Sequence, residues 1–311
     1  MKQTHIGHLA IFVVNLLFGL NTPITKTILL SDYDISPLAL TCFRYIGAAV
    51  AFWLAALVFR APEASRKDIL LFVLASVFGI VLNQTTFVVG LSTTSPVDAS
   101  IVVTLTPIIT MIFAAIFIKE PITTKKVVGV LIGCAGALLL ILTSNTLGSA
   151  PRSLFGNMLC LLSCLSYGLY LTLFRNLIAR NHPLTLMKWM FLFGTVMLLP
   201  FSYDSVIHVP YSSIPLDIYL RIGYVVLVAT FLTYLLIPIG QVRIRPTTLT
   251  MYNYLQPVVT TLLAVYMGLD TFGWHKALAA LLVFLGVYVV TKSKSRQQME
   301  EQKLKEENKA Q

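Results

Sequence analysis

The chain has 311 residues, of which 57% are hydrophobic and only 12% are charged, and its formal net charge is +10. Soluble domains carry about 25% charged residues, so this composition excludes a soluble enzyme, a disordered chain and a disulfide-bonded secreted domain. It favours a helical protein that crosses a membrane several times. The excess of positive charge then indicates basic cytoplasmic loops and not nucleic-acid binding.

Ten stretches are long and apolar enough to cross a bilayer, which takes about 20 residues. In chain order they cover 7–29, 37–59, 69–90, 96–118, 125–143, 154–175, 184–203, 217–239, 246–268 and 273–291. Short connections rich in Pro, Gly, Ser and charged residues separate them. We expect no cleaved signal peptide, because the first stretch is long and contains Asn15, Asn21 and Lys26. The sequence therefore predicts an all-α integral membrane protein with ten transmembrane helices.

Basic residues are distributed unevenly between the two ends of these stretches. Of the 23 lysines and arginines, only Lys26, Arg152, Arg221 and Lys276 would lie at outer ends if the N-terminus is cytoplasmic, and Arg44 would lie within a span. Because cytoplasmic loops carry the excess of Lys and Arg, this asymmetry places both termini in the cytoplasm.

The two halves of the chain align with each other when one is shifted by about 150 residues. The shift superposes residues that disturb helices: Gly90 with Gly240, Pro96 with Pro246, Pro107 with Pro257, and Gly136 with Gly286. A shift of 149 superposes Gly7 with Gly156 and Gly19 with Gly168. Each copy would contain five helices, and because five is odd, the second copy would enter the membrane from the opposite side.

This duplication predicts two inverted five-helix repeats. We expect the first repeat at 1–143, an external linker at 144–153, the second repeat at 154–291, and a charged cytoplasmic tail at 292–311. Inverted repeats give states of similar energy that open to opposite sides, which is what alternating access requires. The organisation therefore favours a transporter.

Several motifs resemble those of the EamA-type branch of the drug/metabolite transporter superfamily. The first helix has Gly19, Asn21 and a terminal Lys26, and the second has Arg44 after Pro37. The fourth has Pro107, followed by Lys119-Glu120-Pro121 and the glycines Gly129, Gly133 and Gly136. The chain departs from the family where Phe18 replaces a common Trp and Asp270 replaces the second Glu. The resemblance covers about 5–292 and implies ten helices, a central cavity and a substrate among amino acids, other metabolites, sugars and nucleotide sugars.

Polar side chains within the spans are costly against lipid, so they face a cavity or another helix. In the first helix Asn15 and Thr22 share a face with Gly19 and Lys26, which predicts either a cavity lining or interhelical packing. Asn83 and Gln84 are adjacent amides in the third helix, and their counterparts in the second half, Thr233 and Tyr234, are also polar. We predict that Asn83, Gln84 and Tyr234 line a substrate cavity.

The ninth helix has the richest polar cluster, in which we expect Asn253, Tyr254 and Gln256 to bind substrate. Pro257 follows it and frees the carbonyl of Asn253, and Pro107 does the same for Val103. Each proline is a candidate hinge, or else marks a structural kink that neighbouring Thr or Asn side chains satisfy.

Trp189 is a candidate for the aromatic wall of the cavity, or else an anchor at the membrane interface. Arg44 is a candidate for binding a substrate carboxylate or phosphate; it could also lock helices together or reach the headgroups. For Glu120, which has Lys119, Lys125 and Lys126 nearby, we expect a structural ion pair or cap. No Asp or Glu lies near the centre of a span, and Asp98 is just inside one end.

These patterns predict a secondary transporter that exports a small polar metabolite, an amino acid or a related compound, by alternating access. The alternative is an exchanger of nucleotide sugars or phosphate esters, which would need more cations than Arg44 and Lys26. We find no HExxH, GxSxG or GxxxxGK[ST] motif, which argues against an intramembrane enzyme or an ATP-driven pump. A structural bundle would not need polar residues at equivalent depths. We expect no cofactor, no metal site and no nucleic-acid partner, a monomer or homodimer, and a bacterial inner-membrane location.

Overall fold

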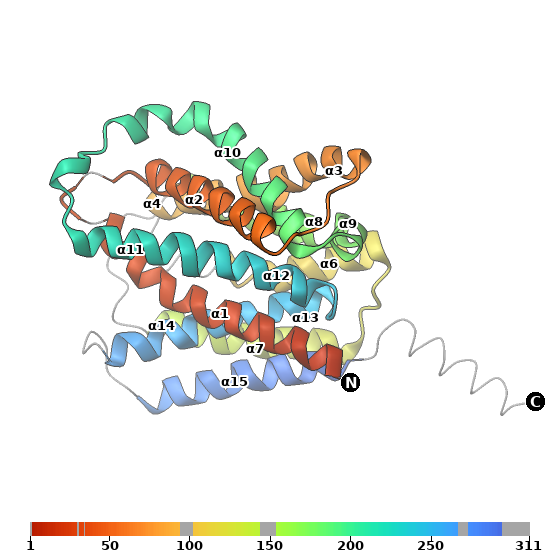
Figure 1. Cartoon of the computed structure of the whole chain (residues 1–311). Helices are drawn as coiled ribbons and strands as arrows, with labels where there is room; N and C mark the ends of the chain where they lie inside the picture. The colour runs from red at the N-terminus through yellow and green to blue at the C-terminus, as the bar shows by residue number, and fades with distance from the viewer. Residues whose placement is uncertain are drawn as a thin grey trace, which may run out of the picture.

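A computed structural model describes residues 2–29, 31–33, 35–93, 102–143, 154–266 and 273–293. The predicted external linker at 144–153 and all but the first two residues of the predicted tail therefore lie outside the described residues. Within the described ranges the chain is helical and has no strand (Figure 1).

The helices follow the apolar stretches of the sequence. In the first half they are α1 (Lys2–Leu29), α2 (Pro37–Val58), α3 (Arg66–Ser76), η1 (Val77–Thr85), α4 (Thr86–Thr93), α6 (Thr106–Ile118) and α7 (Thr124–Thr143). In the second half they are α8 (Leu154–Leu173), α9 (Arg175–Arg180), α10 (Pro183–Ile207), η2 (Tyr211–Ser213), α11 (Leu216–Val226), η3 (Leu227–Leu232), α12 (Thr233–Gln241), α13 (Pro246–Met251), η4 (Tyr252–Tyr254), α14 (Leu255–Tyr266) and α15 (Trp274–Thr291).

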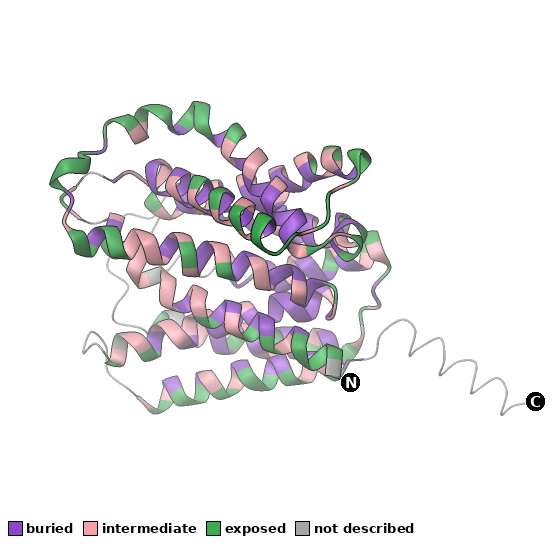
Figure 2. Cartoon of the chain, viewed as in Figure 1, coloured by how far each residue is buried: buried purple, intermediate pink, exposed green. Residues whose placement is uncertain are grey.

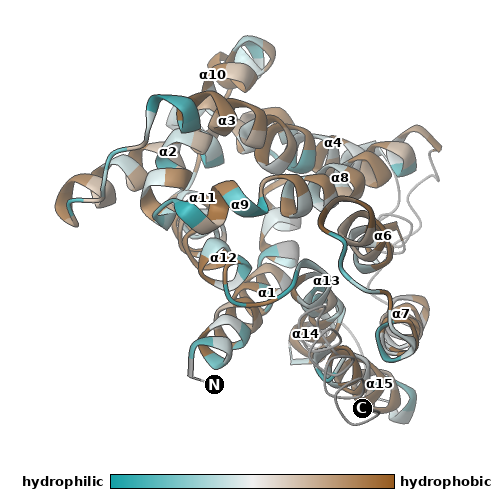
Figure 3. Cartoon of the chain, turned by 90° about the vertical axis from the view of Figure 1, so that its right-hand side faces the viewer, coloured by the Kyte–Doolittle hydropathy of each residue, from teal (hydrophilic) through white to brown (hydrophobic). Residues whose placement is uncertain are grey.

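The outer surface of the bundle is apolar. Large hydrophobic side chains point outward, so that Leu57 is 70% exposed and Phe201 is 76% exposed (Figures 2 and 3). Seven helical runs of the described chain are long and apolar enough to cross a membrane, and α6 is a shorter apolar helix. Such a surface would aggregate in water and fits contact with lipid. The chain is thus an all-helical multi-pass membrane protein, while the count of ten crossings stays a prediction.

The runs α3–η1–α4 and α11–η3–α12 each contain a π-helical segment, and the two segments begin 150 residues apart, at Val77 and Leu227. A π-helix is wider than an α-helix and often marks a functional position. Three carbonyls of η1 accept hydrogen bonds from other helices: Ile80 from Tyr45 Oη at 2.8 Å, Phe78 from Ser166 Oγ at 2.7 Å, and Asn83 from Ser163 Oγ at 2.6 Å. These hydroxyls satisfy backbone groups for which lipid offers no partner.

Two helices are broken just before a proline. A turn at 104–105 precedes α6, which carries Pro107 in its first turn, and the 3₁₀ segment η4 precedes α14, which carries Pro257. The carbonyl of Val103, which Pro107 cannot bond, accepts from Thr106 Oγ1 at 2.7 Å. A neighbouring Thr therefore satisfies the freed carbonyl, which agrees with the interpretation of Pro107 as a structural kink.

Glycines let helices of the two halves approach closely. α7 crosses α15 where a Cβ on Gly286 would lie 2.5 Å from the nitrogen of Gly133 and 2.7 Å from the carbonyl oxygen of Gly129. Figure 1 places α15 along one edge of the bundle and α10, which packs on α2, along the opposite edge. Between these edges α1 packs against α12 and α14, and α8 packs against α4 and α6.

The two ends of the described chain meet the same loop. Arg243 Nε donates to Gln3 Oε1 at 2.9 Å, and Arg245 Nη2 donates to the carbonyl of Ser293 at 2.8 Å. The start of α1 and the end of α15 therefore lie at one end of the bundle (Figure 1). That this end faces the cytoplasm stays a prediction of the charge asymmetry.

Candidate functional site

A cavity of about 190 Å³ lies between helices of both halves. Its polar lining comprises Asn15, Asn21, Thr25, Arg44, Asn83, Gln84, Thr106, Ser163, Tyr167, Tyr234, Asn253 and Gln256. Aromatic and aliphatic side chains such as Phe18 and Phe87 fill the rest of the wall. Pockets for drug-sized ligands measure about 300–1,000 Å³, so this cavity suits a smaller solute.

The cavity brings together most of the predicted site residues, which lie on six helical elements. These are Asn15 on α1, Arg44 on α2, Asn83 and Gln84 on η1, Tyr234 on α12, Asn253 on η4 and Gln256 on α14. The side chains of Thr22 and Lys26, and the whole of Asp98 and Asp270, lie outside the described part of the chain.

Two predicted residues lie away from this cavity. Trp189 packs its ring against Trp53 at 5.3 Å and Phe193 at 5.6 Å between centroids. Tyr254 is buried and donates a hydrogen bond to the carbonyl of Thr104 at 3.0 Å. Its hydroxyl therefore joins the two helix breaks, and the candidate hinges Pro107 and Pro257 each follow a residue that lines the cavity.

The face of α1 that lines the cavity differs from the one expected. Asn21, Thr25 and Leu29 line it together with Asn15, whereas Gly19 packs on α14, where a Cβ would lie 2.7 Å from Val259 Cβ. The sequence left two interpretations of this face open, a cavity lining and interhelical packing. At Gly19 the structure shows interhelical packing. The helical spacing between Asn21 and Thr25 was the signal that could have identified them.

Three of the six amides in the described lining are tied to neighbouring helices. Gln256 Nε2 donates to Asn15 Oδ1 at 2.8 Å, which joins α14 to α1. Asn83 Nδ2 donates to Ser163 Oγ at 3.1 Å. Gln84, by contrast, has both amide atoms buried without a hydrogen-bond partner in the described part of the chain. Its amide is therefore available to a solute in the cavity.

Arg44 is the cation of the described lining. It is 8% exposed, and its Nε donates to Thr230 Oγ1 at 3.0 Å. Thr230 Oγ1 donates in turn to the carbonyl of Val225 at 2.8 Å, within the π-helical turn of η3. The described residues place no carboxylate within ion-pair distance of Arg44.

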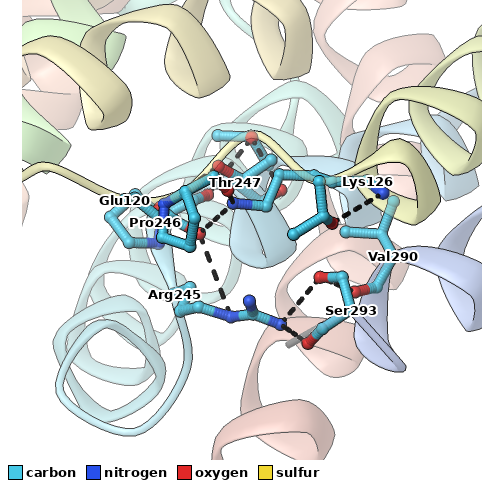
Figure 4. A network of polar contacts seen from close by, with 10 residues as sticks. Glu120, Lys126, Arg245, Pro246, Thr247, Val290 and Ser293 are labelled. Atoms are coloured by element: carbon cyan, nitrogen blue, oxygen red, sulfur yellow. Dashed lines mark hydrogen bonds and ion pairs between the residues drawn. The ribbon is translucent and has the colours of Figure 1, made fainter. Parts of the chain in front are cut away.

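A second polar cluster lies at the end of the bundle where the termini meet (Figure 4). Glu120 Oε1 is 2.9 Å from Lys126 Nζ and 3.9 Å from Arg245 Nε, and Thr247 Oγ1 donates to Glu120 Oε2 at 3.3 Å. Arg245 continues the cluster to Ser293 at the end of α15. Burial lowers the pKa of Arg245 below its ordinary value. The nearby Glu120 carboxylate opposes this shift but does not cancel it. The expected ion pair of Glu120 is present and is formed with Lys126, in the first turn of α7. The contacts of Glu120 with Arg245 and Thr247 join the loop before α7 to the start of α13.

The sequence pattern of the EamA-like transporter family matches residues 5–142 and again residues 154–292. The chain belongs to the EamA-like transporter family. The family pattern thus recurs in the same two halves that align with each other in the sequence.

Relatives agree with this membership. An uncharacterized transporter of Bacillus subtilis, YyaM, is 28% identical over 287 residues, 90% of this chain and 93% of the relative. The uncharacterized inner membrane transporter YicL of Salmonella typhimurium is 23% identical, over 94% of this chain and 97% of the relative. A solved crystal structure superposes with a TM-score of 0.75 at 20% identity, covering 93% of this chain and 96% of that one, and so shares the fold. This EamA-like chain is accordingly a multi-pass membrane protein with a transporter role.

The adjacent amides of this EamA-like chain offer a matched test. We expect Gln84→Met to leave the melting temperature unchanged or raise it, because a buried amide without a partner costs about 1–3 kcal/mol. Asn83→Leu should lower stability by about 1–2 kcal/mol, because it removes the donor to Ser163. Thermal unfolding of both purified variants in one detergent measures the difference. Equal losses would show that Gln84 has a structural partner.

Proposed function

We propose that this EamA-like protein is a secondary transporter that exports a small polar metabolite by alternating access between two inverted five-helix repeats. The observation that supports this proposal most strongly is the shape of the cavity. Residues at equivalent positions of the two halves form most of its lining, but beyond these residues the cavity continues toward one end of the bundle only. The proposal includes the repeat boundaries 1–143 and 154–291, cytoplasmic termini and a bacterial inner-membrane location.

A residue of the first half that contacts the second half has an equivalent in the second half that makes the corresponding contact with the first. This reciprocity supports the two repeats. The Cβ of an alanine at Gly90 would lie 2.8 Å from the carbonyl oxygen of Gly156, and at Gly240 it would lie 3.5 Å from that of Gly7. Gly168 likewise faces Ile109, and Gly19 faces Val259. A pseudo-two-fold axis between the repeats would relate each contact to its counterpart.

The cavity lies where that axis would pass. Its lining includes the repeat-equivalent pairs Asn15 with Cys164, Phe18 with Tyr167, Gln84 with Tyr234, Val103 with Asn253, and Thr106 with Gln256. Binding sites of inverted-repeat transporters lie near the midplane at the repeat interface, often between discontinuous helices. The two helix breaks joined by Tyr254 and Thr104, which are themselves 150 residues apart, have this placement.

Beyond these pairs the two sides differ. Asn21, Thr25 and Leu29 continue the cavity along α1, away from the Glu120 cluster. Their equivalents in the second half are Tyr170, Phe174 and Ile178, which are 2%, 8% and 2% exposed and belong to the hydrophobic core. Exchanging the conformations of the two halves would close the first side and open the second. That exchange is the transport step we propose, and by the charge asymmetry this conformation faces outward.

The cavity also favours a small metabolite over a nucleotide sugar. Its volume is about 190 Å³, and Arg44 is the one cation of its described lining. A diphosphate would need several cations or donors, and the nucleoside a larger pocket.

Cysteine labelling tests the exchange without knowledge of the substrate. In a protein with its four native cysteines replaced, we expect Leu29→Cys to react with an impermeant maleimide from outside and Ile178→Cys to react slowly from the cytoplasmic side. In the double variant, a bulky label at position 29 should prevent outer closure and slow labelling at position 178 severalfold.

The control carries its first label at Ser213, which is exposed in η2. Labelling of Ser213→Cys should leave the reaction at position 178 unchanged. Independence of positions 29 and 178 would contradict alternating access.

A further inference from the structure

Arg44 differs from two other buried cations of the described chain, Lys126 and Lys188. Lys126 pairs with Glu120 at 2.9 Å, and Lys188 lies 4.9 Å from the centroid of the Trp53 ring. Among the described residues Arg44 bonds only the Thr230 hydroxyl, which accepts from its Nε and fixes the plane of the guanidinium. The terminal nitrogens, which form the fork that binds carboxylates two at a time, make no hydrogen bond to the described residues.

An unpaired buried charge is expensive, so a protein that keeps one pairs it during its functional cycle. Arg44 lines the cavity, and the described lining contains no Asp or Glu. A solute that carries a negative charge would supply the counter-charge that the described residues do not provide.

Neutral groups without partners surround the same space. Both amide atoms of Gln84, Asn21 Oδ1 and Thr25 Oγ1 are buried and have no hydrogen-bond partner among the residues that the structure describes. All three residues line the cavity. Together they would accept hydrogen bonds from hydroxyl or amide groups of a solute and donate hydrogen bonds to them.

We propose that the cavity binds a small hydroxylated monocarboxylate, whose carboxylate is held by the terminal nitrogens of Arg44. This inference rests on the proposed transporter function. A single negative charge neutralises Arg44, whereas an amine would add a second cation beside it. The planar guanidinium also matches a carboxylate in a two-bonded geometry. The buried amides and hydroxyls bind the remainder of the solute.

A series of solutes of similar size and different charge tests the proposal. The full-length protein in detergent is titrated with glycerate, serine, glycerol and ethanolamine, and thermal unfolding is followed. We expect glycerate to stabilise the protein at a concentration about tenfold or more below glycerol and ethanolamine, which lack the carboxylate, because a charge-assisted hydrogen bond adds at least that factor. Serine keeps the carboxylate but should bind more weakly than glycerate, because its ammonium adds a second cation beside Arg44. Counterflow of the same four solutes in proteoliposomes measures their transport.

Variants of Arg44 separate substrate binding from a structural role. Arg44→Gln should weaken the glycerate response about tenfold to a hundredfold while leaving the melting temperature of the empty protein unchanged or higher, since it removes an unpaired charge. A structural arginine would instead lower it. Lys188→Gln, at a buried cation outside the cavity, is the control and should keep the glycerate response. If Arg44→Gln does not fold, Arg44→Lys keeps the charge without the fork and should show a weaker response.

The outcomes distinguish this inference from the proposed function. Transport of serine or ethanolamine in preference to glycerate, or a glycerate response that survives in Arg44→Gln, would overturn the anion site and leave the transporter standing. Absence of binding and counterflow for all four solutes would overturn the anion inference and count against the transporter. Preference for glycerate that depends on Arg44 supports both.

Discussion

Replacing Gly286 by alanine is expected to destabilise the protein by about 3 kcal/mol or more, at the upper end of the cost of overpacking. The added Cβ would lie 2.5 Å from the nitrogen and 2.6 Å from the Cα of Gly133. Both are backbone atoms, so no side-chain rotation can relieve the contact. The helices α7 and α15 would have to separate along their interface. Thermal unfolding of the detergent-purified variant measures the loss.

Gly223→Ala is the matched control, because it makes the same chemical change in another helix. No atom lies within 4 Å of the position where its Cβ would be placed. Since alanine is the better helix former by about 1 kcal/mol, this variant should be as stable as the wild type or slightly more stable. Similar melting temperatures for the two variants would show that α7 and α15 do not cross as closely as described.

Glu120→Gln is expected to cost about 3–5 kcal/mol, the usual consequence of removing one partner of a buried ion pair. It leaves Lys126, which is fully buried, without its anion, and it also removes the carboxylate beside Arg245. Lys126→Met should cost less, because Arg245 still lies 3.9 Å from Glu120. Combining Glu120→Gln with Lys126→Met should recover part of the loss. Denaturant or thermal unfolding of the three variants gives the coupling between the two sites.

An exposed pair provides the comparison for this cluster. Asp217 and Arg221 lie 3.4 Å apart on α11 with side chains 58% and 42% exposed. Asp217→Asn should change stability by no more than about 0.5 kcal/mol, because water screens a surface pair. If Glu120→Gln were equally mild, the cluster would be solvated and would not hold the loop before α7 to α13.

The helices and the repeat could be predicted from the sequence because both depend on local chemistry. A bilayer requires long apolar runs, and helices such as α2 (Pro37–Val58) follow the expected stretches closely. Prolines and glycines disturb helices wherever they occur, so the coincidence of Pro107 with Pro257 already indicated a duplication before the two helix breaks were known. The cost of polar groups in lipid likewise identified Asn15, Arg44 and Gln84 as residues that turn away from the membrane.

The rotation of each helix could not be predicted in this way. A helix that is apolar on all sides has no amphipathic face to set its orientation. For this reason Gly19 was a candidate for the cavity lining but packs on α14, whereas Asn21 and Thr25 line the cavity. Trp189 and Tyr254 have the chemistry of site residues, yet both lie away from the cavity. Trp189 packs against the ring of Trp53, and Tyr254 donates a hydrogen bond to the carbonyl of Thr104.

The sequence by itself determined the membrane class, the transporter family and the type of residue that a cavity would need. Only the tertiary structure decided which polar groups find partners. Asn83 bonds Ser163 on another helix, while Gln84, the next residue along the chain, finds no partner among the described residues. Pairing between distant segments depends on the packing of whole helices, and neighbouring residues on one helix point in different directions. Among the described residues that packing leaves Arg44 without a carboxylate, which is why we propose it as the centre of the candidate site.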